Sequence, residues 1–233
     1  KITKKTKAIM PVHLYGNIPD LDSIAVLAEK YNLKIVHDSA EALGSRYKDV
    51  FSTNIQDVSI LSFFPNKVIT TGEGGAVCTN NKNIYNFVEK LKSQGLDGDR
   101  EYYHSHIGYN YRMSGLSAAL GIPQIKRIEN NITRKKLLYD KYQIELNKLG
   151  FKFQQIHKEV SSSFWLLATL VPESHSRDDF KASLLESGIE TRNVFIPLSE
   201  QVPYKTSDKN NLFPNALDIS KRGICLPSSP GLN

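Results

Sequence analysis

The stretch SFFPNKVITTGEGG, residues 62–75, decides the fold. Its first two residues are the end of a run over 57–63 that is rich in β-branched and aromatic residues, which is typical of a buried strand. Pro65-Asn66 then predicts a turn, and Lys67 follows it directly. The glycines at the end of the stretch predict a second bend before another short strand over 75–79. A lysine is therefore expected on a tight turn at the end of a strand.

The residues before this stretch predict alternating strands and helices. Another apolar run, 33–37, ends at Asp38, and a helical spacing of apolar residues over 20–31 precedes it. The run 8–12 predicts a strand before that helix. This alternation favours an α/β fold with a mostly parallel sheet and crossover helices. Active residues of such sheets gather at the carboxyl ends of the strands, where Asp38 and Lys67 both fall.

Asp38 and Lys67 together favour pyridoxal 5'-phosphate (PLP) chemistry. A lysine amine can form a Schiff base with the cofactor aldehyde, and an aspartate can keep the pyridine nitrogen protonated, so that the ring accepts electrons. Ser62, five residues before Lys67, offers a hydroxyl to the cofactor phosphate. Taken singly, a lysine beside glycines is more often a solvated turn residue, and an aspartate after a strand is more often a helix cap. The combination of the three residues favours the cofactor site.

Two further residues have open interpretations. Glu41 lies three residues after Asp38 and either contacts the phenolic oxygen of the cofactor or acts as a capping carboxylate. Asn110 belongs to the segment 106–113, which is either a well-tied loop or part of a phosphate-binding site. The glycine-rich bend is not a P-loop, because its lysine comes before the glycines.

The composition indicates a globular chain. Of its 233 residues, 40% are hydrophobic and 23% charged, which is enough to bury a sizeable core. No apolar run approaches the ~20 residues of a membrane helix. The formal net charge is +6, but the basic residues are dispersed, so we expect neither nucleic-acid nor membrane binding. Cys78 and Cys225 form no disulfide framework and the histidines lack metal-ligand spacing, so we expect no metal site and a cytoplasmic location.

The chain divides into three predicted parts. Residues 1–123 are expected to form the remainder of a large cofactor-binding domain, residues 124–149 a linking helix, and residues 150–233 a small, truncated α+β domain. Pro123 is expected to kink or start the linking helix. The remaining pattern predicts helices or strands over 83–93, 114–122, 164–171, 178–186, 189–195 and 212–221.

Several stretches of the sequence resemble the DegT/DnrJ/EryC1/StrS aminotransferases. These are PLP enzymes of the aspartate-aminotransferase fold (fold type I) that make amino sugars on nucleotide carriers. The resemblance runs along the whole chain and rests on AIMPVHLYG (8–16), HDSAEALGS (37–45), residues 62–75, 108–129, 188–198 and 213–227. Residues 92–104, leading into 108–113, are most similar to members that aminate a GDP-linked 4-keto-6-deoxyhexose. Family members are longer, so the chain resembles the C-terminal part of a complete enzyme, with the first strands missing.

The resemblance assigns Lys67 the Schiff base, Asp38 the pyridine nitrogen and Ser62 the phosphate. It places Glu41 near the phenolic oxygen and Asn110 at the phosphate of the neighbouring subunit's cofactor, which implies a homodimer. The implied reaction gives a nucleotide-linked 4-keto-6-deoxy sugar an amino group, with glutamate as amino donor and Lys67 as the residue that moves the proton.

Two other functions stay open. A PLP-dependent sugar dehydratase would use the same cofactor, but relatives with that activity replace the lysine with histidine, so Lys67 argues against it. A non-enzymatic regulatory or nucleic-acid-binding relative is motivated by the positive charge. Ser199 departs from the family pattern, because many relatives have histidine there, and no sugar contact is assigned to it.

Overall fold

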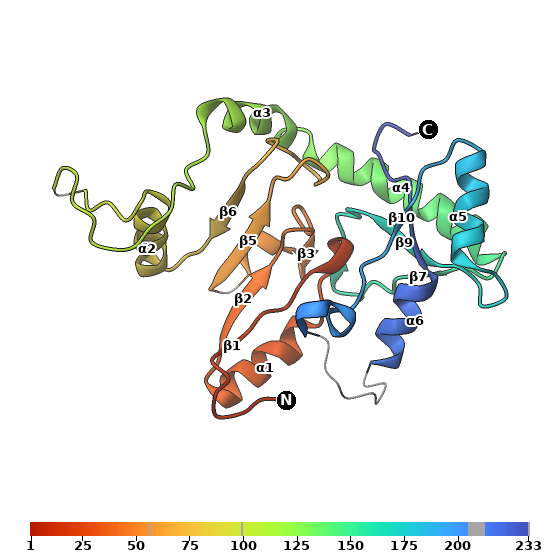
Figure 1. Ribbon diagram of the computed structural model, residues 1–233, viewed down its shortest axis with the longest axis horizontal. Coiled ribbons are helices and arrows are strands. Elements are labelled where there is room, and N and C mark those ends of the chain that lie inside the picture. Colours follow the sequence, from red (N-terminus) through yellow and green to blue (C-terminus); the bar gives the residue numbers. More distant parts are fainter. Residues whose placement is uncertain (56, 99, 205–212, 233) are drawn as a thin grey trace. The chain divides into compact units, whose positions relative to one another are not determined.

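A computed structural model describes residues 1–55, 57–98, 100–204 and 213–232. The chain forms two compact units (Figure 1). The first comprises Lys1–Ile132 and Ile156–Trp165, and the second comprises Thr133–Gln155 and Leu166–Asn233. The predicted division into domains at residues 123 and 150 stays a prediction.

The first unit is built on a four-stranded sheet in the order β1-β2-β5-β6. β1 (Ala8–Ile9), β2 (Lys34–Asp38) and β5 (Val58–Ser62) run parallel, and β6 (Gly75–Cys78) returns antiparallel to β5. Helix α1 (Leu21–Tyr31) connects β1 to β2 and packs on both strands (Figure 1). The predicted α/β class with a mostly parallel sheet is confirmed. The carboxyl ends of β2 and β5 carry Asp38 and Ser62, so the crossover connection places both residues at one edge of the sheet.

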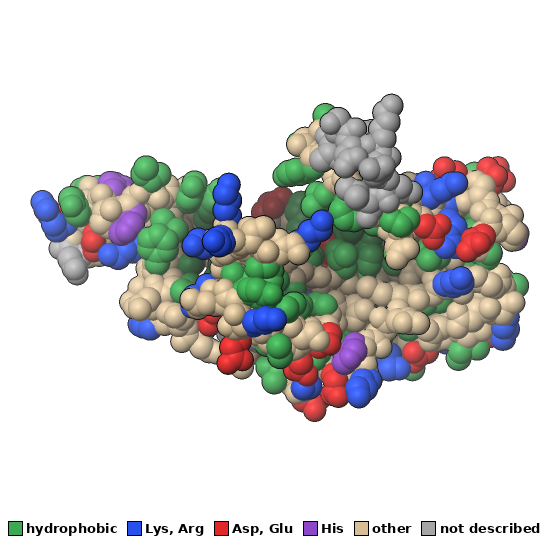
Figure 2. Space-filling model, turned by 90° about the horizontal axis from the view of Figure 1, so that it is seen from below, with side chains coloured by type: hydrophobic (Ala, Val, Ile, Leu, Met, Phe, Trp, Pro, Cys, Tyr) green, Lys and Arg blue, Asp and Glu red, His purple; other side chains and the backbone are tan. Residues whose placement is uncertain are grey.

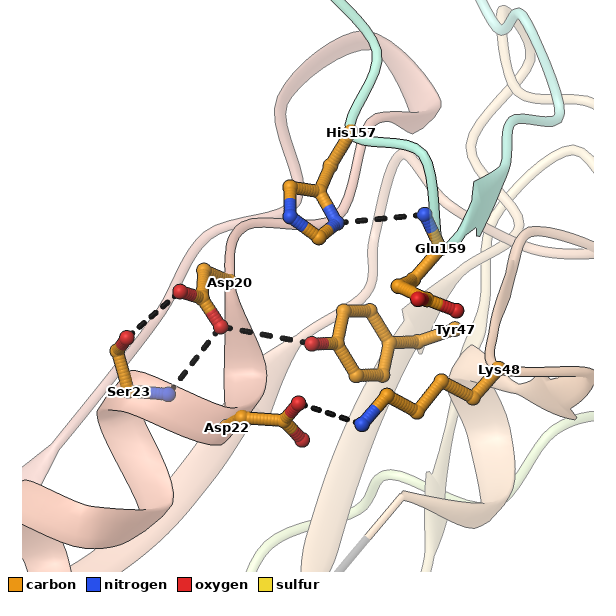
Figure 3. Close-up of polar contacts among 7 residues, drawn as sticks. All are labelled: Asp20, Asp22, Ser23, Tyr47, Lys48, His157 and Glu159. Carbon is orange, nitrogen blue, oxygen red and sulfur yellow. Dashed lines mark hydrogen bonds and ion pairs between the residues drawn. The ribbon is translucent and has the colours of Figure 1, made fainter.

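Polar contacts fix the start of α1, as Figure 3 shows. Asp20 is the N-cap, and its carboxylate accepts hydrogen bonds from the backbone and the hydroxyl of Ser23. The same carboxylate accepts a hydrogen bond from the Tyr47 hydroxyl at 3.4 Å, and Asp22 pairs with Lys48. Tyr47 belongs to β3 (Arg46–Tyr47), the middle strand of a second, three-stranded sheet with β4 (Val50–Phe51) and β8 (Val160–Ser161). The helix is therefore tied to this small sheet.

Serine hydroxyls donate hydrogen bonds to backbone carbonyls in and around the buried loop that follows Asp38. The Ser39 hydroxyl donates to the Ser52 carbonyl, the Ser52 hydroxyl to Ala42, and the Ser45 hydroxyl to the Gly16 carbonyl at 2.6 Å. Because unpaired polar groups are costly to bury, these hydrogen bonds let a loop pass through the interior. Gly16 has a φ of +91°, and a Cβ there would lie 2.7 Å from the Ser163 hydroxyl, so this close approach requires glycine.

The expected break at Pro123 is wrong. Helix α3 (Gly115–Ile125) contains Pro123 in its last turn, and α4 (Ile128–Asn147) begins after Lys126 and Arg127. Pro123 removes one i→i−4 backbone hydrogen bond from the last turn, and α3 ends two residues later, at Ile125. The sequence pattern could not distinguish this position from a helix start. Helix α2 (Lys82–Lys92) also belongs to this unit and has Asn81 as its N-cap. Its bounds agree with the predicted range 83–93 to within one residue at each end.

The second unit is an antiparallel sheet covered by helices. The strand order is β10 (Arg192–Asn193), β11 (Gly223–Leu226), β9 (Leu167–Leu170) and β7 (Lys152–Phe153). Helices α5 (Arg177–Glu186) and α6 (Pro214–Arg222) belong to it, and its core gathers Phe151, Val171, Ile224 and Leu226. The strand expected over 189–195 is only two residues long. Leu212, the first residue of the helix expected over 212–221, lies outside the described residues.

Lys135 on α4 is a buried charge in the second unit, and it makes a pH-dependent stability prediction. It is 6% exposed, and its Nζ donates to the Ser228 carbonyl at 2.6 Å. Burial lowers the pKa of Lys135 from 10.5 to about 8. Between pH 8 and 10.5 the unfolded chain therefore binds more protons there than the folded chain, so the free energy of unfolding rises with pH. From pH 7 to pH 10.5, the free energy of unfolding of the wild type is expected to rise by roughly 3 kcal/mol relative to that of Lys135→Met.

Denaturant titrations of the wild type and Lys135→Met across pH 7–10.5 measure this difference. Lys141→Met, at an exposed position of the same helix, is the control and should follow the wild-type slope. Parallel curves for the wild type and Lys135→Met would show that Lys135 stays protonated in the folded chain over the whole range.

None of the helices in the described part of the chain is both long and apolar enough to cross a membrane.

Candidate active site

Lys67 lies on a tight turn between β5 and β6. Its backbone N–H donates to the Phe64 carbonyl at 3.0 Å, which closes the turn over Pro65 and Asn66. A backbone hydrogen bond from the Thr71 N–H to the Phe63 carbonyl, at 3.0 Å, holds the other end of the loop. The lysine side chain is only 14% exposed, so the charged end points into the protein rather than into solvent. The interpretation of Lys67 as a solvated turn residue is therefore not supported.

Glu41 is the carboxylate nearest to this lysine. Its Oε1 lies 3.7 Å from Lys67 Nζ, and its Oε2 accepts a hydrogen bond from the backbone N–H of Tyr15 at 2.9 Å. Burial raises the pKa of Glu41 above its ordinary value, the Tyr15 hydrogen bond and Lys67 act against this rise, and Asp38 adds to it. Glu41 is in a turn, and its carboxyl group interacts electrostatically with both Lys67 and Asp38. The structure thus brings these three ionisable residues together.

Trp165, which was not predicted as a site residue, also contacts Lys67. Lys67 Nζ lies 3.9 Å from the centroid of the Trp165 ring, a cation–π distance. The indole N–H donates to the Asn66 carbonyl at 2.6 Å, and the indole stacks on the Tyr15 ring. Trp165 is 98 positions from Lys67 in sequence, so no spacing rule could have connected them. That it is the chain's one tryptophan was a weak signal.

Asp38 ends β2 with its backbone fully engaged. Its N–H donates to Pro11 and its carbonyl accepts from His13, both at 3.0 Å. One side-chain oxygen, Oδ1, accepts a hydrogen bond from the Ala40 N–H at 3.1 Å. Among the described residues, no cation forms an ion pair with this carboxylate. A half-buried carboxylate with one oxygen still available can accept a hydrogen bond from a protonated ring nitrogen.

Two buried imidazoles pack together beside the end of β2, one of them on His37, the residue before Asp38. His37 and His13 are both fully buried, with His37 Nδ1 3.2 Å from His13 Nε2 and the rings stacked. Burial, together with His37, lowers the pKa of His13 to about 4, so His13 is neutral at pH 7. These histidines were not predicted as site residues. The contact between the two rings joins the segment at His13 to the end of β2.

Ser62 and Asn110 occupy different surroundings. The Ser62 hydroxyl accepts a hydrogen bond from the Phe64 N–H at 3.3 Å, and Ser62 is the last residue of β5, directly before the loop that carries Lys67. Asn110 is exposed, and its backbone pairs with Ser93 at the end of α2. Within the described residues, no hydrogen bond or ion pair joins Asn110 to the Lys67 cluster. Three of the other predicted residues (Asp38, Glu41 and Lys67) thus lie together, Ser62 ends the strand before the Lys67 loop, and Asn110 is apart from them.

Gln124 on α3 clamps the loop that carries Lys67. Its Oε1 accepts from the Thr70 N–H at 3.0 Å, and its Nε2 donates to the Thr70 carbonyl at 2.7 Å. The helix and the loop also approach closely, since a Cβ on Gly121 would lie 3.1 Å from Thr71. The Gln124 side chain therefore pairs with both backbone polar groups of Thr70, as a neighbouring strand would in a sheet.

We expect Gln124→Met to lower the free energy of unfolding by about 1–3 kcal/mol, because it leaves two half-buried backbone groups of Thr70 unpaired. Gln124→Glu keeps the acceptor for the Thr70 N–H, but it places a carboxylate oxygen against the Thr70 and Leu120 carbonyls, so it should also lose stability. Thermal unfolding measures both variants, with Lys126→Met, an exposed position nearby, as the control for added apolar surface. Equal effects of Gln124→Met and Lys126→Met would mean that the clamp does not stabilise the loop.

The chemistry of these side chains fits PLP. The cofactor requires a primary amine for its aldehyde, an acid partner for its ring nitrogen and donors for its phosphate. Lys67 supplies the amine in a largely buried position, Asp38 supplies a carboxylate oxygen outside any ion pair of the described chain, and Ser62 supplies a hydroxyl. An aspartate at the end of β2 and a lysine on the turn after the adjacent parallel strand β5 match the fold type I PLP enzymes that the sequence resembles.

The chain belongs to the DegT/DnrJ/EryC1/StrS aminotransferase family, whose profile it matches over residues 1–233. It is 43% identical to the GDP-perosamine synthase of Escherichia coli O157:H7, over 100% of this chain and 63% of that protein. It is 38% identical to the GDP-perosamine synthase of Vibrio cholerae, over 100% of this chain and 64% of that protein. The chain thus spans less than two-thirds of the length of these relatives.

The same family is found among solved structures. The putative sugar aminotransferase Spr1654 of Streptococcus pneumoniae, in its PLP form, matches with a TM-score of 0.90 and 29% identity. The match covers 100% of this chain and 66% of that chain. The family and fold expected from the resemblance are confirmed.

Proposed function

We propose that the protein is a PLP-dependent aminotransferase that converts a GDP-linked 4-keto-6-deoxy sugar to the 4-amino sugar, a perosamine-type reaction. The observation that carries the proposal is the position of the largely buried Lys67, which lies on the turn after β5 with its Nζ 3.7 Å from Glu41 Oε1. The family and the GDP-perosamine synthases among its relatives support the reaction class and the nucleotide.

Each side chain has a role in this proposal. PLP, when bound, supplies an aldehyde that captures amines and a ring that accepts electrons. Lys67 is the amine that would hold the cofactor, and, when free, its Nζ would accept and return a proton. Asp38 would keep a proton on the ring nitrogen, Glu41 would face the phenolic oxygen, and Ser62 would donate to the phosphate. The clamp by Gln124 would keep the Lys67 loop in place during turnover.

The substrate proposal is tested with the complete protein, PLP and glutamate as amino donor. We expect a GDP-linked 4-keto-6-deoxyhexose to be aminated with a higher kcat/KM than its UDP- or dTDP-linked counterparts, and 2-oxoglutarate to appear in equal amount. A preference for another nucleotide would overturn the GDP assignment, and amination without glutamate consumption would overturn the donor.

We also propose that the complete protein is a homodimer in which Asn110 serves the cofactor of the partner. The exposure of Asn110, outside the Lys67 cluster of its own chain, supports this proposal. Mixing a Lys67→Ala chain with an Asn110→Ala chain should then restore up to roughly a quarter of the wild-type activity, because half of the subunits enter mixed dimers and each mixed dimer carries one intact site.

Subunit exchange must be shown separately, for example with differently tagged chains. Absence of complementation despite exchange would place Asn110 in a structural role or in the site of its own chain.

The two other functions receive less support. The family and its relatives are aminotransferases, and Lys67 is retained, which disfavours the dehydratase. Nucleic-acid binding would require a basic face. On the face that Figure 2 shows, Lys and Arg side chains are scattered among acidic and apolar ones. We therefore also propose that the protein binds no nucleic acid. Its two free cysteines are consistent with a cytoplasmic location.

A further inference from the structure

The Lys67 ammonium is held by an aromatic face and a carboxylate, here called the lysine cradle and made of Trp165 and Glu41. The Nζ lies 3.9 Å from the Trp165 ring centroid and 3.7 Å from Glu41 Oε1. Trp165 is 4% exposed and the Glu41 side chain 11%, so both contacts are shielded from water. A cation–π contact that is shielded from water is stronger than an exposed one, because fewer water molecules compete with the ring for the cation.

The backbone on both sides of the cradle is unusual. Tyr15, which donates its N–H to Glu41 and stacks on Trp165, has a φ of +58°. Phe164, directly before Trp165, has a φ of +50°. Aromatic residues rarely adopt this left-handed region, and they keep it only where the surrounding structure enforces it. Two such residues beside one lysine indicate that the fold maintains the cradle at a cost.

Trp165 also fixes the main chain next to the lysine. Its indole N–H donates to the carbonyl of Asn66, the residue before Lys67, at 2.6 Å. One side chain therefore holds both the turn and the charged end of the lysine that the turn carries.

We infer that Trp165 is a positioning residue, whose indole face, with Glu41, holds the Lys67 ammonium whenever this amine is not bonded to the cofactor. The inference rests on the proposed function, because a transaminase releases its lysine in each turnover. A free lysine side chain has many rotamers, and holding it in one place keeps the amine within reach of the reacting atoms.

The direct test is NMR of the complete, cofactor-free protein with ¹³C-labelled lysine. The Cε signal that disappears in Lys67→Arg belongs to Lys67. Its attached protons should lie upfield of those of the other lysines, because of the ring current of the indole. Trp165→Leu should remove this shift, and Trp165→Phe should retain part of it. A wild-type Lys67 signal among the ordinary lysine signals would overturn the inference, whether or not the Trp165 variants fold.

A kinetic comparison separates the aromatic face from the indole N–H. Both Trp165→Phe and Trp165→Leu lose the hydrogen bond to Asn66, but only the phenylalanine keeps a π face for Lys67. We expect Trp165→Leu to lower kcat about 2- to 30-fold relative to Trp165→Phe, with little change in KM for the sugar. Equal kcat values in the two variants would overturn the positioning role.

The proposed function is tested apart from this inference. Reduction of the wild-type protein with borohydride in the presence of PLP labels Lys67 if the proposed function holds, whatever the NMR signal shows. A labelled Lys67 without an upfield signal would overturn the cradle alone. An upfield signal without a label would support the cradle and overturn the proposed function.

Discussion

The Lys67→Ala variant of the complete protein is expected to lose transamination by roughly 10²–10⁴-fold or more, the usual contribution of a positioned acid–base residue. The loss should be larger than for any other single substitution proposed for the site, because Lys67 combines covalent attachment with proton transfer. The Nζ is the one amine that contacts both Glu41 and Trp165 in the described chain. Steady-state assay with saturating sugar and glutamate measures the effect.

Two controls make this result specific. Lys148→Ala, an exposed surface lysine, should keep wild-type activity. The Lys67→Ala protein should still bind PLP, more weakly, through the remaining contacts to the phosphate and the ring. Normal turnover by Lys67→Ala would show that another residue performs the chemistry.

The second large effect is expected for Asp38→Asn. The hydrogen bond between its carboxylate and a protonated ring nitrogen is worth about 1.5–3 kcal/mol, as for other hydrogen bonds to charged groups. Since the electron-accepting ring is needed in the transition state, kcat should fall by about 10- to 150-fold. The asparagine keeps the oxygen that accepts from Ala40, so the loop after β2 stays intact.

The thermal stability of the cofactor-free Asp38→Asn protein separates chemistry from folding. We expect a melting temperature close to that of the wild type, because the Oδ1 hydrogen bond survives. Asp57→Asn, on the exposed connection before β5, is the matched control and should keep full activity. An unchanged rate in Asp38→Asn would mean that this aspartate only caps the loop.

Local patterns predicted the part of the site that depends on strand ends. The apolar runs before Asp38 and around 57–63 give β2 and β5, and parallel pairing then brings their carboxyl ends to one edge. The turn at Pro65-Asn66 follows from the conformational preferences of these two residues. The presence of a lysine and an aspartate at one edge was thus accessible from the sequence.

The rest depends on contacts between distant segments. Trp165 reaches Lys67 from 98 residues away, and Gln124 reaches Thr70 from 54. Neither contact leaves a periodic pattern in the sequence, because each depends on how separate segments pack. The prediction for Pro123 was wrong because a sequence pattern does not distinguish a proline at a helix start from one in the last turn of a preceding helix.

The most direct test of the account is to locate the cofactor attachment. The complete protein is loaded with PLP, reduced with borohydride, digested and analysed by mass spectrometry. We expect a yellow protein before reduction and one reduced pyridoxyl group on the peptide that contains Lys67, with no such label in Lys67→Ala. A label on another lysine, or none on a folded and PLP-saturated protein, would contradict the assignment of Lys67 and with it the proposed function.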